Sequence, residues 1–465
     1  MFVPFSIFPE TQWPAVPSPY AGGLLGILFQ LEQSQWWSPA EIAEQQARQL
    51  RIVLEHARET VPFYWDRIPR AAEHPGEHAQ RFSSWDGIPL LSRRDVQLAG
   101  TSLHSSKVPV NHGQLRTTAT GGSTGQPVQI LTTDFTDLMW RVLTLRDHLW
   151  HRRDFRQSFA AIRYAKDDVG RPPAGTTLDT WGGSTKNVVP TGPAHLLNVQ
   201  STIREQAEWL QRLSPGYAMA YPSALLGIAR IFEAEGGRLP GLRQILTNGE
   251  VLECRETLES VFGVPVRDMY SSQEVGYIAL QCPAGEGYHV QSENVLVEVL
   301  TESGQPCRPG QVGKIVVTTL HNFAMPLIRY EIGDYAEIGT CTCGRGLPVL
   351  KRILGRQRNL LTMPNGEKRW PVFASVDGGD EEGDEDENRD ELPAFFQFQV
   401  VQRTLDTLDV NVVRPGGALT ADEQSKVERH FHRMLGYPFK VNVHCVSEVP
   451  RSPTGKFEDF VSLVE

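Results

Sequence analysis

The sequence is short of basic charge, cysteine and long apolar runs, and each shortage disfavours a class of protein. Its 465 residues carry 45 Lys and Arg against 55 Asp and Glu, a formal charge of −10. Such a chain has no basic field to attract nucleic acid. No apolar run reaches the roughly 18 to 20 residues that a membrane span needs. Nucleic acid and membranes are therefore disfavoured as partners, and a small molecule is favoured.

The cysteines and the N-terminal composition indicate the compartment. Six cysteines are too sparse for a disulfide scaffold. Residues 1–34 are apolar but contain five prolines and no Lys or Arg, whereas a secretory signal begins with basic residues. We therefore expect a protein of the reducing cytoplasm.

Length and pattern predict at least two domains, because a chain this long exceeds what one hydrophobic core usually holds. Apolar residues recur at helical spacing over 39–61. After residue 103, short apolar runs broken by Gly and Pro alternate with helical stretches such as 135–149 and 203–213. This alternation predicts an α/β architecture, and the runs 295–300 and 314–318 predict a β-meander.

The C-terminal part predicts a separate, compact α+β domain. It contains a helical pattern over Ala421–Leu435 between strand-like runs at 396–401, 408–413 and 440–446. Before it lies the stretch 377–391, which holds ten acidic residues and no large apolar one. We expect this stretch to be a disordered surface insertion, since it cannot bury enough surface to offset its ordering entropy. An acidic docking loop or a cation-binding loop is the alternative.

A glycine- and hydroxyl-rich stretch, Thr117 to Pro127 (TTATGGSTGQP), is the first candidate for chemistry. Glycine lets backbone N–H groups approach an oxyanion closely, and hydroxyls add donors without bulk. The stretch lacks the Gly-Lys-Ser/Thr ending of a P-loop and the dinucleotide pattern G-x-G-x-x-G. It predicts a polyphosphate cradle, with a flexible turn as the alternative. The candidate phosphate-binding residues are Thr120, Gly121, Gly122, Ser123, Thr124 and Gly125.

The motif T-G-G-S-T-G-x-P resembles the phosphate loop of the adenylate-forming superfamily of acyl-CoA synthetases, and other motifs of that family follow in order. They are Tyr270 to Glu274 (YSSQE), Tyr330 to Asp334 (YEIGD), Arg352 to Arg356 (RILGR) and Pro450 to Lys456 (PRSPTGK). Within the superfamily the chain resembles most the phenylacetate-CoA ligase group, with its capsule-biosynthesis and coenzyme F390 synthetase-like relatives. The stretches that carry this finer resemblance are His56 to Tyr64, Ile88 to Leu91 and Cys343 to Pro348.

The resemblance implies a large, multi-subdomain N-terminal adenylation domain over 1–355 and a small, mobile α+β lid domain over 356–465. It also implies how the site works. Lys456 is the catalytic lysine, delivered by the small domain to the substrate carboxylate and the nucleotide. Glu274 holds Mg²⁺ against the phosphates of ATP, as suits a hard cation that prefers carboxylate oxygen. An ordinary exposed lysine is the alternative for Lys456.

Four further residues are implied to bind the nucleotide. Asp334 accepts hydrogen bonds from both ribose hydroxyls, Arg356 reaches the ribose, and Tyr270, followed by Ser271, stacks on adenine. The alternatives are a turn residue for Asp334, a surface ion pair for Arg356 and a core aromatic for Tyr270. Two positions depart from the family pattern: Arg358 stands where an acidic hinge residue is usual, and Gln273 replaces the common Thr.

A second group predicts a structural zinc site. Cys282, His289, Cys341 and Cys343 supply three thiolates and one imidazole, a full tetrahedral set with no open position. Spacing alone favours four reduced residues that never meet. We nevertheless give the zinc site equal weight, because both segments lie beside the nucleotide motifs that the resemblance implies.

The acyl pocket is the least readable part of the sequence. The candidates are Trp140, Trp181, Tyr221, Gly249, Glu250 and Tyr277. Their aromatic rings suit an aryl acid, although core packing is the alternative for Trp140.

The resemblance implies two half-reactions. A carboxylate and MgATP give acyl-AMP and pyrophosphate, and a thiol of CoA or of a carrier pantetheine then displaces AMP. One alternative is an adenylase that passes the acyl group to an amine or a carrier protein without CoA. The other is a non-catalytic adenylate-binding protein. The sequence leaves the acid and the oligomeric state open.

Overall fold

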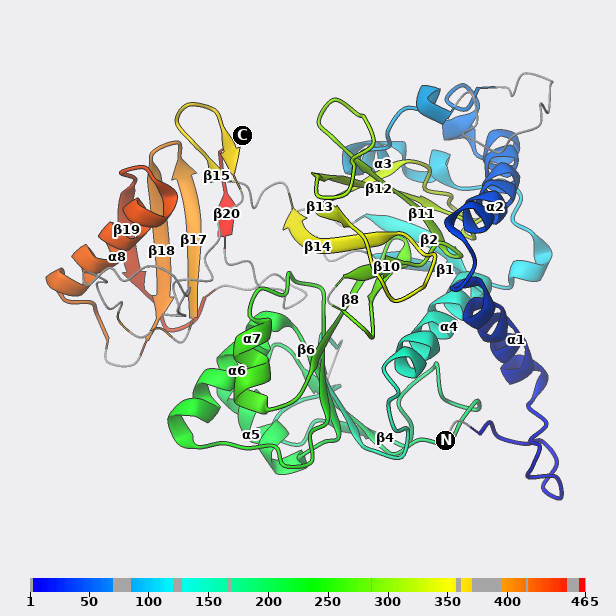
Figure 1. The fold of residues 1–465 in the computed structure, drawn as a ribbon, viewed down its shortest axis with the longest axis horizontal. Coiled ribbons are helices and arrows are strands. Elements are labelled where there is room, and N and C mark those ends of the chain that lie inside the picture. Colours follow the sequence, from blue (N-terminus) through cyan, green and yellow to red (C-terminus); the bar gives the residue numbers. More distant parts are fainter. Residues whose placement is uncertain are drawn as a thin grey trace.

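The computed structural model describes residues 3–69, 85–119, 128–165, 169–285, 287–356, 361–369, 393, 395, 397–414, 417–449 and 460–464. Two bodies are visible in Figure 1, a large unit built on a twelve-stranded sheet and a small unit built on a four-stranded sheet. This arrangement confirms the predicted α/β fold with a separate small α+β part. None of the helices in the described part of the chain combines the length and apolar character that crossing a bilayer requires.

The large sheet changes from parallel to antiparallel pairing at β8. Strands β5, β3, β6, β7 and β8 are parallel to one another, the edge strand β4 pairs antiparallel with β5, and the strands from β8 to β11 along the sheet pair antiparallel. The strands in spatial order are β11 (Val295–Leu300), β12 (Val312–Thr319), β13 (Tyr330–Gly339), β14 (Val349–Arg356), β10 (Tyr288–Val290), β9 (Gly276–Gln281), β8 (Val266–Ser272), β7 (Gln244–Asn248), β6 (Tyr217–Ala220), β3 (Phe159–Arg163), β5 (Ala194–Asn198) and β4 (Thr176–Leu178).

Helices cover both faces of the parallel part. On one side lie α5 (Ile203–Leu213), α6 (Pro222–Glu235) and α7 (Arg255–Phe262), and on the other α1 (Pro19–Ser34) and α4 (Asp134–Trp150) (Figure 1). Two of them begin at capping boxes, which satisfy the first free N–H groups of the helix. Thr133 starts α4 and Thr202 starts α5 in this way. The predicted helices 135–149 and 203–213 are thereby confirmed.

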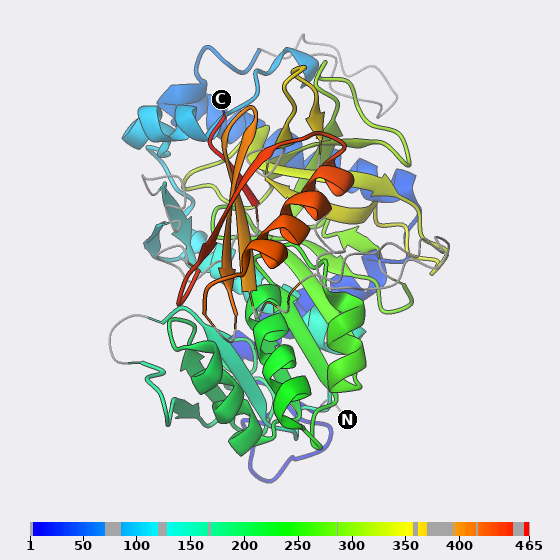
Figure 2. The same cartoon turned by 90° about the vertical axis from the view of Figure 1, so that its left-hand side faces the viewer.

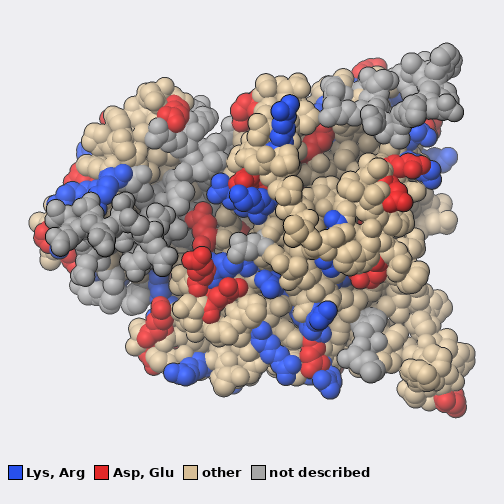
Figure 3. All heavy atoms as spheres, viewed as in Figure 1, with Lys and Arg blue, Asp and Glu red and all other residues tan. Residues whose placement is uncertain are grey.

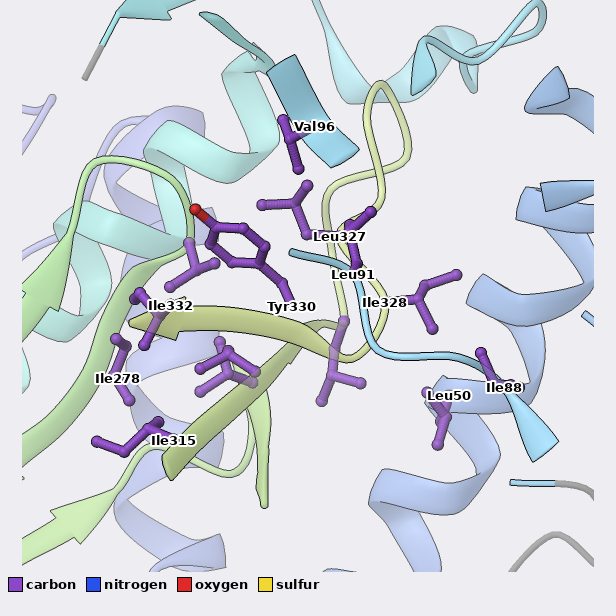
Figure 4. Packing of buried hydrophobic residues seen from close by; sticks show 14 of the residues in the cluster. Leu50, Ile88, Leu91, Val96, Ile278, Ile315, Leu327, Ile328, Tyr330 and Ile332 are labelled. Atoms are coloured by element: carbon purple, nitrogen blue, oxygen red, sulfur yellow. The ribbon is translucent and has the colours of Figure 1, made fainter. Parts of the chain in front are cut away.

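A hydrophobic core joins the antiparallel strands to α2 (Pro39–Thr60) and α3 (Arg93–Ala99) (Figure 4). Leu91 lies between these layers. Its N–H donates to the carbonyl of Arg329 and its carbonyl accepts from the N–H of Glu331, both at 2.9 Å. This bridge fixes the start of α3 against β13. The short helices η1 (Pro62–Tyr64), η2 (Trp85–Gly87), η3 (Gly100–Leu103) and η4 (Val110–His112) complete this region.

The small unit has its own core. Its sheet has the order β19 (Lys440–Cys445), β18 (Thr407–Val413), β17 (Gln397–Thr404) and β20 (Phe460–Ser462). Helix α8 (Ala421–Leu435) covers one face, and Leu361, before the sheet, joins the same core. Figure 2 shows α8 in front of the strands, so the other face of this sheet is turned toward the large unit. The pair β15 (Leu361–Thr362) and β16 (Lys368–Arg369) precedes it.

A buried polar network packs beneath α4. Arg153 donates to Asp147 and to Gln244, and its guanidinium lies 2.9 Å from Nδ1 of His148. Burial lowers the pKa of His148 to about 3 and that of His151 to about 4, and the neighbouring Arg153 adds to both shifts. Both imidazoles are therefore neutral in the folded protein at neutral pH.

We expect the protein to lose stability as the pH falls from about 6.5 toward 4. In that window the unfolded chain protonates both histidines and the folded chain does not, so lowering the pH favours unfolding by roughly 1 to 3 kcal/mol per pH unit. Urea unfolding at pH 7, 6 and 5 measures this. His151→Gln should reduce the slope. A free energy of unfolding that stays constant over this range would contradict the account.

Candidate active site and metal centre

The predicted phosphate loop lies between two strands that the large unit holds firmly. Strands β1 (Leu115–Ala119) and β2 (Gln129–Thr133) form an antiparallel hairpin. The side-chain amide of Asn322 donates to the carbonyl of Leu131 at 3.0 Å, and Arg116 pairs with Asp134 at 2.6 Å. The candidate residues Thr120, Gly121, Gly122, Ser123, Thr124 and Gly125 themselves lie outside the described residues. The hairpin therefore fixes both ends of the loop.

Two predicted nucleotide residues meet at the end of β8. The hydroxyl of Tyr270 donates to a carboxylate oxygen of Asp334 on β13 at 2.7 Å. Asp334 in turn pairs across the sheet with Arg356 of β14, whose side chain lies outside the described residues. Ser271 lies next along β8, paired with Tyr277 of β9. Residues that are 64 positions apart in the chain thus form one cluster.

Glu274 lies just beyond this cluster, and an arginine that the sequence analysis missed holds it. The Glu274 side chain is 8% exposed, and Nη1 of Arg93 donates to its Oε1 at 3.2 Å. Arg93 is the first residue of α3, whose N-cap is Ser92. The only signal in the sequence was its place directly after the stretch Ile88 to Leu91. A carboxylate at this position offers the hard oxygen ligand that Mg²⁺ prefers.

The remaining predicted catalytic and hinge positions cannot be placed. Lys456, Arg358 and the acidic stretch 377–391 lie outside the described residues. Their roles stay predictions.

The acyl-pocket candidates fall into three places. Trp140 of α4 packs on Tyr277 of β9, with ring centroids 5.1 Å apart, beside Ser271. Tyr221 precedes α6, and Glu250 accepts from the N–H of Ser223 in its first turn at 3.0 Å.

Gly249 and Glu250 follow β7 directly, and Tyr221 follows β6, so these residues share the sheet edge at which β8 ends. Gly249 has a φ of +78°, a conformation that favours glycine.

Trp181 is not brought together with the other candidates. Its ring lies 5.3 Å from that of Tyr217 and 5.2 Å from that of Phe159, and its Nε1 donates to the carbonyl of Gln157. Tyr217 and Phe159 are the first residues of β6 and β3. Because these strands run parallel, Trp181 lies at the opposite ends of the strands from Tyr221 and Glu250.

The four predicted metal ligands meet. Their ligand atoms all lie within 4.8 Å of one another. The sulfurs of Cys282 and Cys341 are 3.7 Å apart, and the sulfur of Cys343 is 3.2 Å from Nε2 of His289. Nδ1 of His289 faces the carbonyl of Leu347 at 3.3 Å, which leaves Nε2 directed at the sulfurs. The interpretation of four residues that never meet is therefore wrong.

The donor set fits a structural zinc ion, which binds three thiolates and one imidazole as a closed tetrahedron. Burial raises the pKa of the Cys282 thiol to about 12, and a bound zinc ion would lower it so that the sulfur binds as a thiolate. Beside the cluster, the Arg345 guanidinium stacks between the rings of Trp36 and Trp150 at 4.7 and 4.5 Å. Its Nε donates to the side chain of Gln35 at 2.7 Å. The cysteine loop is thereby tied to the junction of α1 and α2.

Comparison with known proteins gives relatives along almost the whole chain. A phenylacetate-coenzyme A ligase of Escherichia coli (strain K12) is 24% identical over 429 residues, which cover 89% of this chain and 93% of that protein. Protein CapK of Staphylococcus aureus is 25% identical over 225 residues, 46% of this chain and 44% of that protein. No family model matches the chain.

Among solved structures, a 2-hydroxyisobutyryl-CoA ligase in the postadenylation state superimposes with a TM-score of 0.68 at 17% identity, over 93% of this chain and 91% of that one. An anthranilate CoA ligase in complex with anthranoyl-AMP gives a TM-score of 0.51 at 15% identity, over 73% and 64% of the two chains. The fold is that of the adenylate-forming ligases. The sequence relatives are phenylacetate-CoA ligases and CapK, which confirms the resemblance to that group indicated by the motifs.

Proposed function

We propose that this protein uses ATP to activate a carboxylic acid as an acyl-adenylate and then transfers the acyl group to the thiol of CoA. The contact that carries the proposal is the hydrogen bond between Tyr270 and Asp334 at the end of β8, with Glu274 four residues beyond Tyr270. The hairpin of β1 and β2 holds the ends of a glycine-rich loop in the same large unit. The named ligases that resemble this chain in sequence and fold support the same chemistry.

The first half-reaction is attack of a substrate carboxylate oxygen on the α-phosphorus of ATP, with loss of pyrophosphate. This step brings two anions together, so positioning and charge compensation are the main demands on the protein. Glu274 would hold Mg²⁺, which offsets charge on the phosphates. Lys456 would bridge the carboxylate and the nucleotide.

Asp334 would accept hydrogen bonds from the ribose. A carboxylate offers about four lone-pair sites, of which the hydroxyl of Tyr270 uses one. In this proposal both ribose hydroxyls donate to Asp334, and the ring of Tyr270 stacks on adenine. Arg356, opposite Asp334 in the sheet, would complete the ribose site.

In the second half-reaction the CoA sulfur attacks the acyl carbonyl carbon, the bond to the AMP oxygen breaks, and the thiol proton is released. The small unit, 356–465, would turn between the two steps. An aryl acid is the substrate class we favour, because the rings of Trp140 and Tyr277 pack against each other beside Ser271. The six free cysteines support a reducing, cytoplasmic setting.

Pyrophosphate release should occur with at least one acid from a panel of aryl and alkyl carboxylates, and thioester should form only when CoA is added. Coupled assays with and without CoA measure both steps. Release without any thioester would favour the adenylase that serves an amine or a carrier protein. If no acid released pyrophosphate and Lys456→Ala bound ATP as well as wild type, a non-catalytic adenylate-binding protein would replace the proposal.

The cluster of Cys282, His289, Cys341 and Cys343 would bind one zinc ion, and this ion would hold the loop 341–347 against the large sheet. We expect about one zinc per purified chain, and we expect Cys343→Ser to bind zinc at least tenfold more weakly and to melt at a lower temperature. Elemental mass spectrometry and thermal unfolding measure the two effects. Cys445→Ser, at an exposed cysteine outside the cluster, should keep both properties. A metal-free wild type with unchanged activity would contradict this assignment.

A further inference from the structure

An open cavity lies at the end of β8 that is far from the candidate active site. Its volume is about 510 Å³. It forms where α7 ends at Phe262 and β8 begins at Val266, whereas Ser272 and Glu274 follow at the other end of β8. The cavity is lined by Arg255, Glu259, Gly263, Val264, Pro265 and Arg267.

Arg267 is the unusual residue of this cavity. Its Nε is buried and has no hydrogen-bond partner among the described residues. Burial lowers the pKa of Arg267, and the neighbouring Arg255 lowers it further. A guanidinium keeps its proton in proteins, so Arg267 is a half-buried charged group beside a second arginine, with Glu259 as the nearest opposite charge in the cavity.

The groups around Arg267 already have other partners. Nη1 of Arg255 donates to the carbonyl of Val266, and a Glu259 carboxylate oxygen accepts from the N–H of Val266 at 2.8 Å. The third nearby guanidinium, that of Arg153, is paired with the buried Asp147. Figure 3 shows Lys and Arg interspersed with Asp and Glu over the face it presents, without a large patch of one sign. The cavity itself brings together two arginines, Arg255 and Arg267, with Glu259 beside them.

We propose that this cavity binds a phosphate-bearing small molecule, with Arg267 and Arg255 donating to its phosphate oxygens. The planar guanidinium fork matches a phosphate group, and its N–H donors gain the acceptors they lack. The volume falls within the range of small-molecule sites and exceeds what one inorganic phosphate needs. The site lies outside both half-reactions as far as their residues are placed above.

Two sources supply this chemistry. Coenzyme A carries a 3′-phosphate and a diphosphate at one end of a long flexible arm and its thiol at the other, so the phosphates can bind away from the reacting sulfur. This source rests on the proposed function. Free diphosphate, such as the pyrophosphate released in the first half-reaction, is the other.

Calorimetric titration of CoA, dephospho-CoA and pyrophosphate tests the site without acid or ATP, so a failure of the proposed reaction does not affect the result. The proteins compared are wild type, Arg267→Gln, Arg255→Gln and, as a matched control, Arg238→Gln at an exposed arginine. We expect at least one compound to bind wild type and the control equally and to bind both cavity variants about tenfold more weakly.

If the cavity variants lose affinity for CoA but not for dephospho-CoA or pyrophosphate, the cavity binds the 3′-phosphate of CoA. If they lose affinity for pyrophosphate as much as for CoA, the cavity binds a free diphosphate. Because Nε of Arg267 has no hydrogen-bond partner within the described structure, Arg267→Gln should melt no lower than wild type and remains informative if Arg255→Gln misfolds. The proposal is overturned if none of the three compounds binds wild type, or if Arg267→Gln binds them with wild-type affinity.

Discussion

Replacing Glu274 with Gln is expected to slow acyl-adenylate formation about 100- to 1000-fold, the usual cost of losing a preorganised group that stabilises charge. Gln has nearly the same shape and can still accept from Arg93, so the change removes charge and little else. The loss should appear in kcat for pyrophosphate release, and raising Mg²⁺ should not restore it fully. Pyrophosphate exchange and single-turnover kinetics measure the effect.

A second glutamate provides a matched control for this result. Glu298 accepts from Arg329 at 3.2 Å and is also largely buried, but it lies in the packing between β11 and β13. Glu298→Gln should lower stability while leaving kcat within about twofold. Arg93→Gln should lower kcat less than Glu274→Gln, because it alters the position of the carboxylate and keeps its charge. A Glu274→Gln enzyme with wild-type kcat would remove Glu274 from the proposed mechanism.

Replacing Asp334 with Asn is expected to raise KM for ATP about 10- to 100-fold, since hydrogen bonds to a charged acceptor contribute roughly 1.5 to 3 kcal/mol each. The amide presents one oxygen where the carboxylate presents two, so the two ribose hydroxyls and Tyr270 compete for it. Steady-state kinetics at saturating acid measure KM, and nucleotide titration measures the binding directly.

Variants at Tyr270 separate the two roles of that side chain. Tyr270→Phe removes the hydrogen bond to Asp334 and keeps the ring, so it should change KM for ATP by about fivefold or less. Tyr270→Ala removes the ring as well and should have a larger effect if the ring stacks on adenine. Asp179→Asn, at an exposed position after β4, should leave KM unchanged. An Asp334→Asn enzyme with unaltered KM would show that the ribose is bound elsewhere.

The sequence predicted the elements whose local signals are strong. The helix over Ala421–Leu435 was predicted with its observed bounds, because Thr420 and Glu423 form a capping box and Gly436 ends the helix in a left-handed conformation. The meeting of Cys282, His289, Cys341 and Cys343 was also predicted, because both segments lie beside the nucleotide motifs that the family resemblance implies. Asp334 and Tyr270 were assigned to one nucleotide site through the family motifs, and the structure shows them in contact.

Other features depend on packing that no local pattern reveals. Arg93 reaches Glu274 across 181 positions of sequence, and it does so because Leu91 bridges to the strand region of Arg329 and Glu331. Trp181 was grouped with the acyl pocket on its aromatic character. Aromatic character does not tell at which end of a strand a side chain lies, and the structure places Trp181 beside Tyr217 at the start of β6.

The contacts of Arg345 with Gln35 and Trp36 hold the junction of α1 and α2, and they can form only late in protein synthesis. Arg345 and Gln35 are 310 positions apart. At 5 to 20 residues per second, a ribosome needs roughly 15 to 60 s to make the chain between them. Until then, the first two helices leave the ribosome without the loop that holds their junction. Trp36 and Trp37, both exposed even in the finished protein, are then available to chaperones.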